Sequence, residues 1–580
     1  MTTAAIQTVW AELLIGSLAD GGVADVVVSP GSRSTPLTAA LAGEPRLRVH
    51  PVIDERAAGF FALGLARAAG APVALVCTSG TAPAHYLPAV IEAAMAGVPL
   101  VVISANRPPE LHGAGASQTI DQLRLFGGFV RRFDDLGPPD GSALALRALR
   151  RKVGQALAAA RGPAPGPVHL DVPLRKPLEP AAPATDAERA AAAEAARLAT
   201  TPLPATAPVV RVPDSLIEAA AAAITAAPRG VIIATAGPAT RAAGRDAAFA
   251  LAARAGYPLL AEAGSQLRFA DRPDAVVAVD RFGLIAGGPA AAPLAPELIV
   301  QLGGEPVAMG WPRLAGAGGR APRRFVIAEH GWPDGDSSAE AVLIGDVAVT
   351  LARLATALAT PRLPGAWTRA WTEADRQARA AMTAALAALP GAEGAAVAAA
   401  IAAVPDDGQL VLGNSLPIRV ADEVADGGRN LTVLTQRGAA GIDGLIAGAA
   451  GAAATGRPTV LVLGDVSFAH DVGALALVRG RPLAVVVIDN DGGRIFDDLP
   501  VAGAALPAGA FDRLWRTPPA LEPVAAARGF GLPGWTVRNP DELAAAIGAA
   551  IAGGGAVIHV PVAPASARAA RDAALAALAS

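Results

Sequence analysis

Two short segments in the C-terminal part of the chain pass from aliphatic residues into oxygen-bearing side chains. Leu461–Ser467 and Val485–Gly493 both start as apolar runs bounded by Gly and Asp, the pattern of buried parallel strands. Ligands of open α/β sheets bind beyond the carboxyl ends of such strands, so Asp465 and Asn490 are expected at one edge. A carboxylate, an amide oxygen and the free carbonyls of a Gly-rich turn suit Mg²⁺. The alternative is a plain βαβ unit with polar strand ends, joined by a helix over Asp471–Val478.

Glu55 is the second residue that could carry chemistry. It lies where an expected strand passes into a helix, directly before the apolar run Ala57–Leu63. A carboxyl group against apolar surface holds a proton more readily, which suits it to share a proton with a ring nitrogen. The alternative is a glutamate in the first helical turn that only complements the helix dipole.

Several other chemistries are excluded by residue usage. Cys77 is the only cysteine, which rules out an internal disulfide and a cysteine-based zinc site. Lys152 and Lys176 are the only lysines, and neither stands in a Gly-x-x-x-x-Gly-Lys loop for nucleotide phosphates. Both lie among Arg or Pro in polar surroundings, which argues against a Schiff-base lysine.

Composition indicates a large cytoplasmic protein. The 580 residues suffice for about three or four domains of ~150 residues, and 52% hydrophobic with 17% charged residues gives ample core. No continuous apolar run reaches the ~18 residues of a membrane span, and the first residues do not resemble a secretory signal. The net charge of −3, with both signs interspersed, argues against nucleic acid or membrane as a partner.

Strands and helices alternate along the whole chain, which predicts an α/β fold of three doubly wound parallel-sheet domains. We expect a first domain over 1–185, a linker over 186–208, a central domain over 209–360 and a C-terminal domain over 366–580. The expected strands are Val26–Val28, Leu47–Ile53, Val73–Cys77, Pro99–Ser104 and Val168–Val172, then Val231–Ile233, Tyr257–Leu260, Leu298–Gln301 and Phe325–Ile327, and finally Leu410–Leu412, Leu431–Leu434, Val460–Leu463, Val485–Ile488 and Ala556–Val560.

Motifs spread over nearly the whole chain carry a family resemblance. They are Ser29–Ser34 (SPGSRS), Asp54–Arg56, Thr78–Thr81, Ala105–Pro109, Gly413–Ser415, Arg437–Gly444 (RGAAGIDG), Gly464–Asp465 and Asn490–Phe496 (NDGGRIF). With them the chain resembles the thiamine-diphosphate-dependent decarboxylases and carboligases, whose three domains are a pyrimidine-binding, a central and a diphosphate-binding domain. Within that superfamily it is most similar to the 2-succinyl-5-enolpyruvyl-6-hydroxy-3-cyclohexene-1-carboxylate synthases of menaquinone biosynthesis.

The resemblance implies thiamine diphosphate held through Mg²⁺ or Mn²⁺. By motif position, the metal ligands are Asp465, Asn490 and the carbonyl of Gly492. Glu55 is the catalytic residue and would bond the pyrimidine N1′, so that the cofactor generates its own carbanion. The remaining residues that the resemblance assigns to the cofactor are Ser415, Ser467, Ile495 and Ile442, the last as the wedge that bends the cofactor.

The substrates that the resemblance implies are 2-oxoglutarate and isochorismate. Decarboxylation of the first would give a succinic semialdehyde carbanion, which adds 1,4 to the ring of the second. Carboxylates call for permanently charged, bidentate donors, which means arginine. The implied substrate residues are Arg33, Arg107, Arg419 and Arg437, with Ser32, Gln118 and Ser415 as neutral donors and Phe496 beside Ile495 as pocket wall.

Two positions depart from the family pattern. A lysine that relatives often carry after the Gln-Leu-Gly turn would fall near Met309 and is missing here, and the sequence leaves open whether Arg313 replaces it. Where many relatives have Asn, this chain has Ser117 before Gln118. Both departures concern carboxylate binding.

The superfamily builds its active sites between subunits, which implies a homodimer or homotetramer. Two rival functions remain: another carboligase or 2-oxo acid decarboxylase of the same fold, and a cofactor-binding regulatory protein without catalysis. The central domain offers no motif with an assignable role.

Overall fold

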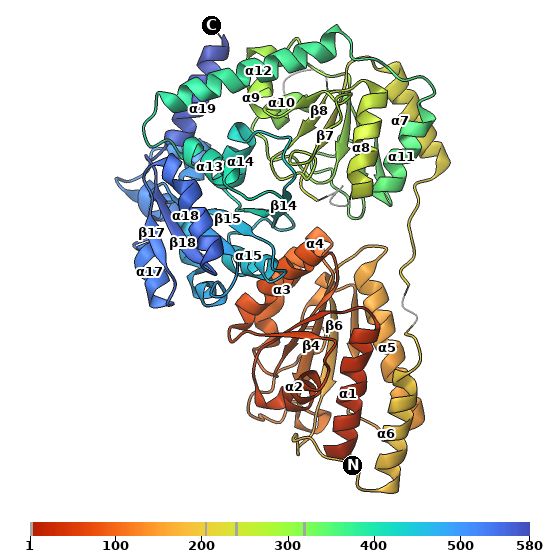
Figure 1. The fold of residues 1–580 in the computed structure, drawn as a ribbon. Coiled ribbons are helices and arrows are strands. Elements are labelled where there is room, and N and C mark those ends of the chain that lie inside the picture. The colour runs from red at the N-terminus through yellow and green to blue at the C-terminus, as the bar shows by residue number, and fades with distance from the viewer. Residues whose placement is uncertain (1–3, 204–205, 238–241, 317–320, 580) are drawn as a thin grey trace. The chain divides into compact units, whose positions relative to one another are not determined.

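The computed structural model describes residues 4–203, 206–237, 242–316 and 321–579. Within them the strands form three six-stranded sheets, and every strand pair with an assigned register is parallel. Helices alternate with the strands along the chain (Figure 1). The predicted fold class, three doubly wound parallel sheets, is therefore confirmed.

The N-terminal sheet has the strand order β2-β1-β3-β4-β6-β5. Its strands are β1 (Asp25–Val28), β2 (Arg48–Pro51), β3 (Val73–Cys77), β4 (Leu100–Asn106), β5 (Arg132–Asp135) and β6 (Val168–Pro173), and its helices are α1 (Ala4–Asp20), α2 (Thr35–Ala42), α3 (Glu55–Ala69), α4 (Leu87–Ala96), α5 (Ala143–Arg161) and α6 (Asp186–Ala199). Helices α1, α5 and α6 pack against one another, while α3 packs on β3 and α4 (Figure 1). Helix α6, which falls in the segment expected to be a linker, thus lies against two helices of this sheet.

The central sheet has the order β12-β11-β10-β7-β8-β9. Its strands are β7 (Gly230–Ala234), β8 (Leu259–Ala261), β9 (Ala278–Val279), β10 (Leu298–Leu302), β11 (Arg323–Ala328) and β12 (Ala341–Ile344), and its helices are α7 (Asp214–Ala226), α8 (Ala242–Ala255), α9 (Phe282–Gly287), α10 (Trp311–Leu314) and α11 (Val347–Ala357). Helix α11 packs on α7 and α8 (Figure 1).

The C-terminal sheet has the order β14-β13-β15-β16-β18-β17. Its strands are β13 (Gln409–Leu412), β14 (Thr432–Thr435), β15 (Thr459–Gly464), β16 (Leu483–Asp489), β17 (Gly534–Thr536) and β18 (Ala556–Pro561), and its helices are α12 (Ala366–Ala387), α13 (Glu393–Ala402), α14 (Leu416–Val424), α15 (Leu445–Ala453), α16 (Asp465–His470), α17 (Pro523–Gly529), α18 (Pro540–Ala552) and α19 (Ser566–Ala579). The order is that of the N-terminal sheet, strand for strand.

The chain divides into two compact units. The first runs to Pro208 and includes the short segments Gly438–Ala440 and Ala447–Thr455, and the second holds the rest of the chain. Within the second unit a single apolar core extends from the central sheet, through Trp371 of α12, to the C-terminal sheet. None of the helices in the described residues has the length and hydropathy of a membrane span.

One predicted helix differs in type. The segment Asp471–Val478 was expected to form the helix between β15 and β16. The structure instead begins α16 at Asp465 and forms a 3₁₀ helix over Val472–Leu477. The connection from β15 to β16 therefore consists of a short α-helix followed by a 3₁₀ helix.

Candidate functional site

The predicted metal ligands lie together at the carboxyl end of the C-terminal sheet. Strands β15 and β16 are adjacent, and Asp465 and Asn490 directly follow them. The Asp465 carboxylate accepts the N–H of Gly492 at 2.7 Å and that of Val466 at 2.9 Å. These bonds tie the turn after β16 to the end of β15, so the three proposed ligands belong to one constellation.

Only glycine fits at position 492. Its φ of 107° lies in the region that L-residues avoid, and a Cβ there would come within 2.5 Å of the Arg516 carbonyl oxygen. The Gly492 carbonyl accepts the N–H of Arg494 at 2.8 Å. Since a carbonyl has two lone pairs, this bond leaves one for a cation.

Burial shapes the electrostatics of this constellation. It raises the pKa of Asp465 to about 6 and the pKa of Glu393, the first residue of α13, to about 7. The Oδ1 atom of Asn490 is buried and has no hydrogen-bond partner among the described residues. A cation would relieve both the crowded carboxylates and this orphaned oxygen. Ser467 is buried in the turn that Asp465 begins.

The donor set fits a hard cation. One carboxylate, one amide oxygen and one backbone carbonyl are all oxygen ligands, which Mg²⁺ prefers when phosphates complete its shell. The described residues contain no group of three or more His, Cys, Asp or Glu side chains placed to hold a metal ion.

A second group of predicted residues surrounds the start of α14. Ser415 has a φ of 70°, a strained backbone conformation for a residue with a Cβ. Its carbonyl accepts from the Arg419 guanidinium at 2.8 Å. Arg437 donates to Asn414 Oδ1 at 3.0 Å. Both arginines are thus anchored to the same turn.

Asn414 is a residue that sequence reasoning missed as a site residue, although it stands in the Gly413–Ser415 motif. Its amide nitrogen donates to the carbonyls of Gln436 and Gly441, both at 2.7 Å. These bonds fix the loop that carries Arg437 and the half-buried Ile442. The motif itself was the available signal.

Glu262, which follows β8, was also missed. It is buried and accepts the N–H groups of Val307 at 2.5 Å and Ala308 at 2.9 Å. Burial and the nearby Asp422 raise its pKa to about 8, while the charge of Arg437 opposes that shift. A single glutamate after a short strand gave no sequence signal.

In the N-terminal sheet, two predicted arginines lie near each other. Arg33 is buried, donates to the Leu174 carbonyl at 2.7 Å and keeps an unpartnered Nε among the described residues. Arg107 donates to the Ser79 hydroxyl. Burial, and next the positive charge of Arg107, lower the pKa of Arg33. Two guanidinium groups that repel each other in a partly buried place favour an anion between or beside them.

Gln118 is held at the same turn. Its Nε2 donates to the Ser79 carbonyl at 3.0 Å, and its backbone has a φ of 55°. Gly80, with a φ of 85°, leaves room for the Gln118 side chain, which a Cβ there would meet at 2.7 Å. Ser32 is exposed at the start of the short 3₁₀ helix Ser32–Ser34 that carries Arg33.

A buried hydrogen-bond network under these loops was not predicted. The Asp171 carboxylate accepts from Ser104 Oγ at 2.8 Å, from Asn106 Nδ2 at 2.7 Å and from Gln122 Nε2 at 3.1 Å. Gln122 in turn accepts the N–H of Gly80 at 3.0 Å. The network connects β4 and β6 to the turn that holds Arg107 and Gln118.

Glu55 lies half-buried in the first turn of α3. Asp54 caps this helix by accepting the N–H groups of Arg56 and Ala57, and Gly70 ends it with a φ of 65°. The cap fixes the helix start and with it the Glu55 backbone. Glu55 belongs to the first compact unit and Asp465 to the second.

The remaining predicted residues are Ile495 and Phe496, which are half-buried in the short 3₁₀ helix Arg494–Asp498. Ile495 packs against the core that the central and C-terminal sheets share. Of the two positions near the absent lysine, Met309 is exposed, and Arg313 donates to the Gly287 carbonyl at 3.1 Å. Arg313 is therefore occupied by a structural bond.

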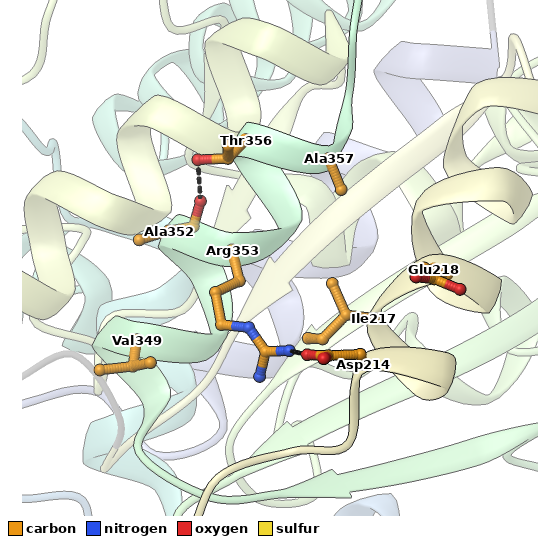
Figure 2. A pocket seen from close by; sticks show the side chains of 8 residues that line it. All are labelled: Asp214, Ile217, Glu218, Val349, Ala352, Arg353, Thr356 and Ala357. Atoms are coloured by element: carbon orange, nitrogen blue, oxygen red, sulfur yellow. Dashed lines mark hydrogen bonds and ion pairs between the residues drawn. The ribbon is translucent and has the colours of Figure 1, made fainter.

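A surface pocket of the central domain is lined by none of these residues (Figure 2). It is lined by Asp214, Ile217 and Glu218 of α7 and by Val349, Ala352, Arg353, Thr356 and Ala357 at α11. Arg353 pairs with Asp214, and Thr356 donates to the Ala352 carbonyl (Figure 2). These interactions occupy Asp214, Arg353 and the Thr356 hydroxyl, and we assign no role to the pocket.

Family models match both ends of the chain. Residues 9–125 match the thiamine pyrophosphate enzyme N-terminal TPP binding domain, and residues 422–560 match the C-terminal TPP binding domain. The first range holds Glu55 and Arg33, and the second holds Asp465 and Asn490. The two matches therefore identify thiamine diphosphate as the cofactor of this chain.

Curated relatives match nearly the full chain. The 2-succinyl-5-enolpyruvyl-6-hydroxy-3-cyclohexene-1-carboxylate synthase of Sorangium cellulosum is 41% identical over 96% of this chain and 93% of its own. The proteins of that name from Myxococcus xanthus and Geobacillus kaustophilus are 41% and 37% identical, over 96% and 90% of this chain and 95% and 89% of theirs. Among solved structures, the thiamine diphosphate-dependent 4-hydroxybenzoylformate decarboxylase of Rhodococcus jostii superposes with a TM-score of 0.69 at 18% identity, covering 96% of this chain and 99% of that one. This last likeness concerns the fold alone.

Proposed function

Because this chain belongs to the 2-succinyl-5-enolpyruvyl-6-hydroxy-3-cyclohexene-1-carboxylate synthase family, we propose that it performs that synthesis in menaquinone biosynthesis. The reaction is the decarboxylation of 2-oxoglutarate and the 1,4-addition of the remaining four-carbon unit to isochorismate, with release of CO₂. The observation that carries the proposal is the similarity, over nearly the full chain, to synthases of that name. Arginines held by hydrogen bonds in the N-terminal and the C-terminal domain add support.

Thiamine diphosphate, when bound, supplies the acyl-anion chemistry that side chains alone lack. We assign Mg²⁺ or Mn²⁺ to Asp465, Asn490 and the Gly492 carbonyl. The orphaned Asn490 Oδ1 and the bond between Asp465 and the Gly492 turn support this assignment. Ser467 and Ser415 are assigned to polar contacts with the cofactor, and Ile442 and Ile495 to apolar ones.

Glu55 is assigned to proton exchange with the pyrimidine N1′ of the cofactor. A half-buried carboxyl group on a capped helix end is held in one place and shielded in part from water. Those are the conditions in which a carboxyl group shares a proton with a ring nitrogen. We also propose that the working enzyme is a homodimer or homotetramer whose sites combine Glu55 of one subunit with Asp465 of another.

The two substrates bring several carboxylates, and the arginines are assigned to them. Arg33 and Arg107 form one cationic pair. The effect of the Arg107 charge, which lowers the pKa of Arg33, supports this pairing. Arg419 and Arg437 form a second one at the start of α14, supported by their shared anchoring to the Asn414–Ser415 turn. Ser32 and Gln118 are assigned as neutral donors and Phe496 as a pocket wall. A pyruvate-type enzyme needs no such set of cations.

We further propose the domain limits of a pyrimidine-binding domain over 1–185, a linker over 186–208, a central domain over 209–360 and a diphosphate-binding domain over 366–580. The ranges that match the two cofactor-binding family models, 9–125 and 422–560, fall inside the first and last of these.

The function is tested by CO₂ release from 2-oxoglutarate with thiamine diphosphate and Mg²⁺, with and without isochorismate. We expect isochorismate to accelerate release strongly and its own absorbance to change as the ring is substituted. Release from pyruvate that is indifferent to isochorismate would replace the proposal with another carboligase. Absence of turnover despite cofactor binding would support a regulatory protein.

A further inference from the structure

Glu393, the first residue of α13, lies beside the proposed metal site, and none of the assignments above uses it. Its side chain is only 1% exposed. Its Oε2 accepts from Asn490 Nδ2 at 2.9 Å, and its backbone N–H donates to Ser566 Oγ at 3.0 Å. Helix α13 packs on β15 and β16, the two strands that carry the proposed ligands.

An asparagine beside a cation has two possible orientations. Its amide can turn either an acceptor oxygen or a donor NH₂ group toward the metal, and only the oxygen can ligate. A divalent cation beside Glu393 favours its ionised form, which accepts hydrogen bonds and cannot donate them. Glu393 then selects the orientation in which Asn490 turns its NH₂ group toward α13, the one in which Asn490 Nδ2 donates to Glu393 Oε2. The Asn490 oxygen is thereby directed away from Glu393, and it is the atom that has no partner among the described residues.

From this geometry we propose that Glu393 is a positioning residue that fixes the amide of Asn490 with its oxygen toward the divalent cation. The inference rests on the metal site of the proposed function and adds to it the residue that sets the ligand's orientation. Removing an outer partner that orients a metal ligand typically lowers metal affinity or activity by roughly 10- to 100-fold.

The buried position of Glu393 argues against a merely structural role. A buried carboxylate with one oxygen unpartnered is a poor way to attach a helix to a sheet, because its desolvation is not compensated. A nearby divalent cation supplies that compensation for Glu393 and for Asp465 together. In the absence of a cation, a hydrogen bond between two neutral side chains would connect α13 to the end of β16 at a lower desolvation cost than the bond from Asn490 to Glu393.

Two substitutions separate orientation from charge. Glu393→Met keeps the length of the side chain and removes the strong acceptor, whereas Glu393→Gln keeps an acceptor and removes the charge. Glu423→Gln is the matched control, because Glu423 is another buried carboxylate of the same unit and pairs with Arg571. The readout is the dissociation constant for Mn²⁺ with thiamine diphosphate present, measured from the free-ion electron paramagnetic resonance signal and independent of turnover.

We expect Glu393→Met to weaken Mn²⁺ binding by roughly 10- to 100-fold. Glu393→Gln should retain most of the affinity, and Glu423→Gln should bind as the unchanged protein does. If Glu393→Met does not fold, Glu393→Asp takes its place, because the shorter side chain keeps the charge but cannot reach Asn490, and the same weakening is expected.

Mn²⁺ affinity within twofold of the unchanged protein in Glu393→Met, or in its replacement, overturns the inference. A loss in Glu393→Gln as large as that in Glu393→Met also overturns it, since charge and not orientation would then be the cause. Failure of the metal site itself is distinguished by Asp465→Asn. If the unchanged protein and Asp465→Asn bind Mn²⁺ equally, the site assignment is wrong, whatever Glu393 does.

Discussion

Gly492→Ala tests the geometry of the proposed metal site through a single methyl group. The added Cβ would lie 2.5 Å from the Arg516 carbonyl oxygen, which is backbone and cannot rotate away, at a φ of 107°. Holding a residue with a side chain in such a conformation costs about 1–3 kcal/mol. The turn will relax to avoid this cost, and the relaxation will displace the carbonyl assigned to the cation.

If metal binding requires the turn to return to its strained conformation, the binding free energy of the metal becomes less favourable by the cost of that strain. A cost of about 1–3 kcal/mol corresponds to a roughly 5- to 150-fold weaker dissociation constant. Isothermal calorimetry of Mg²⁺ binding, with thiamine diphosphate present, measures this change. Gly503→Ala is the matched control, because nothing lies within 4 Å of a Cβ at that position. Equal Mg²⁺ affinity in the two variants would refute the assignment of the Gly492 carbonyl as a ligand.

Three further predictions concern the N-terminal sheet. Glu55→Gln should suppress turnover by orders of magnitude while thiamine diphosphate affinity, measured by calorimetry, stays within a few fold; retained turnover would remove Glu55 from the mechanism. Arg33→Met should raise the KM for an acidic substrate by roughly 10- to 150-fold, the value of a lost charged hydrogen bond, and an unchanged KM for both substrates would contradict its role. Burial alone would raise the pKa of Asp25, but bonds from His50 and Arg48 lower it to about 2. Because the folded-state pKa lies below that of the unfolded chain, ionised Asp25 stabilises the fold at pH values above the unfolded-state pKa, and this stabilisation is lost as pH falls through about 2. Asp25→Asn should therefore make the free energy of unfolding, measured with urea, depend less steeply on pH between pH 4 and 2. An unchanged pH dependence would contradict the lowered pKa of Asp25.

The sequence predicted the strands that are buried on both faces. Runs such as Val73–Cys77 and Val485–Ile488 are continuously aliphatic, and nothing but a central parallel strand accommodates them. The edge strands β5, β9, β12 and β17 were missed. Segments such as Arg132–Asp135 and Gly534–Thr536 are short and polar or exposed, because an edge strand has a neighbour on one side only.

The metal constellation was predictable for the same reason. Polar residues directly after two buried strands must lie at one edge, whatever the rest of the fold does. The error over Asp471–Val478 shows the limit of that reasoning. Its apolar spacing suits a helix, but spacing alone did not distinguish one α-helix from the short α16 and the 3₁₀ helix that the structure contains.

The supporting residues could not have been predicted. Glu393 stands 97 positions before Asn490, and nothing in the sequence tells which of the 51 acidic residues faces that amide. Asp171 and Glu262 likewise take their roles from partners on other elements. A glutamate at the start of an Ala-rich, almost wholly apolar helix was the one signal for Glu393, since such a charge is rarely buried without a partner.

The fate of the carbons of 2-oxoglutarate tests the proposed function most directly. The protein would be incubated with isochorismate, thiamine diphosphate and Mg²⁺, with 2-oxoglutarate labelled with ¹³C either at C1 or at C2. We expect mass spectrometry to find the C1 label entirely in CO₂ and the C2 label in one product, in which it is joined to the isochorismate ring. Label from C2 found only in succinic semialdehyde, with isochorismate unchanged, would contradict carboligation to that acceptor.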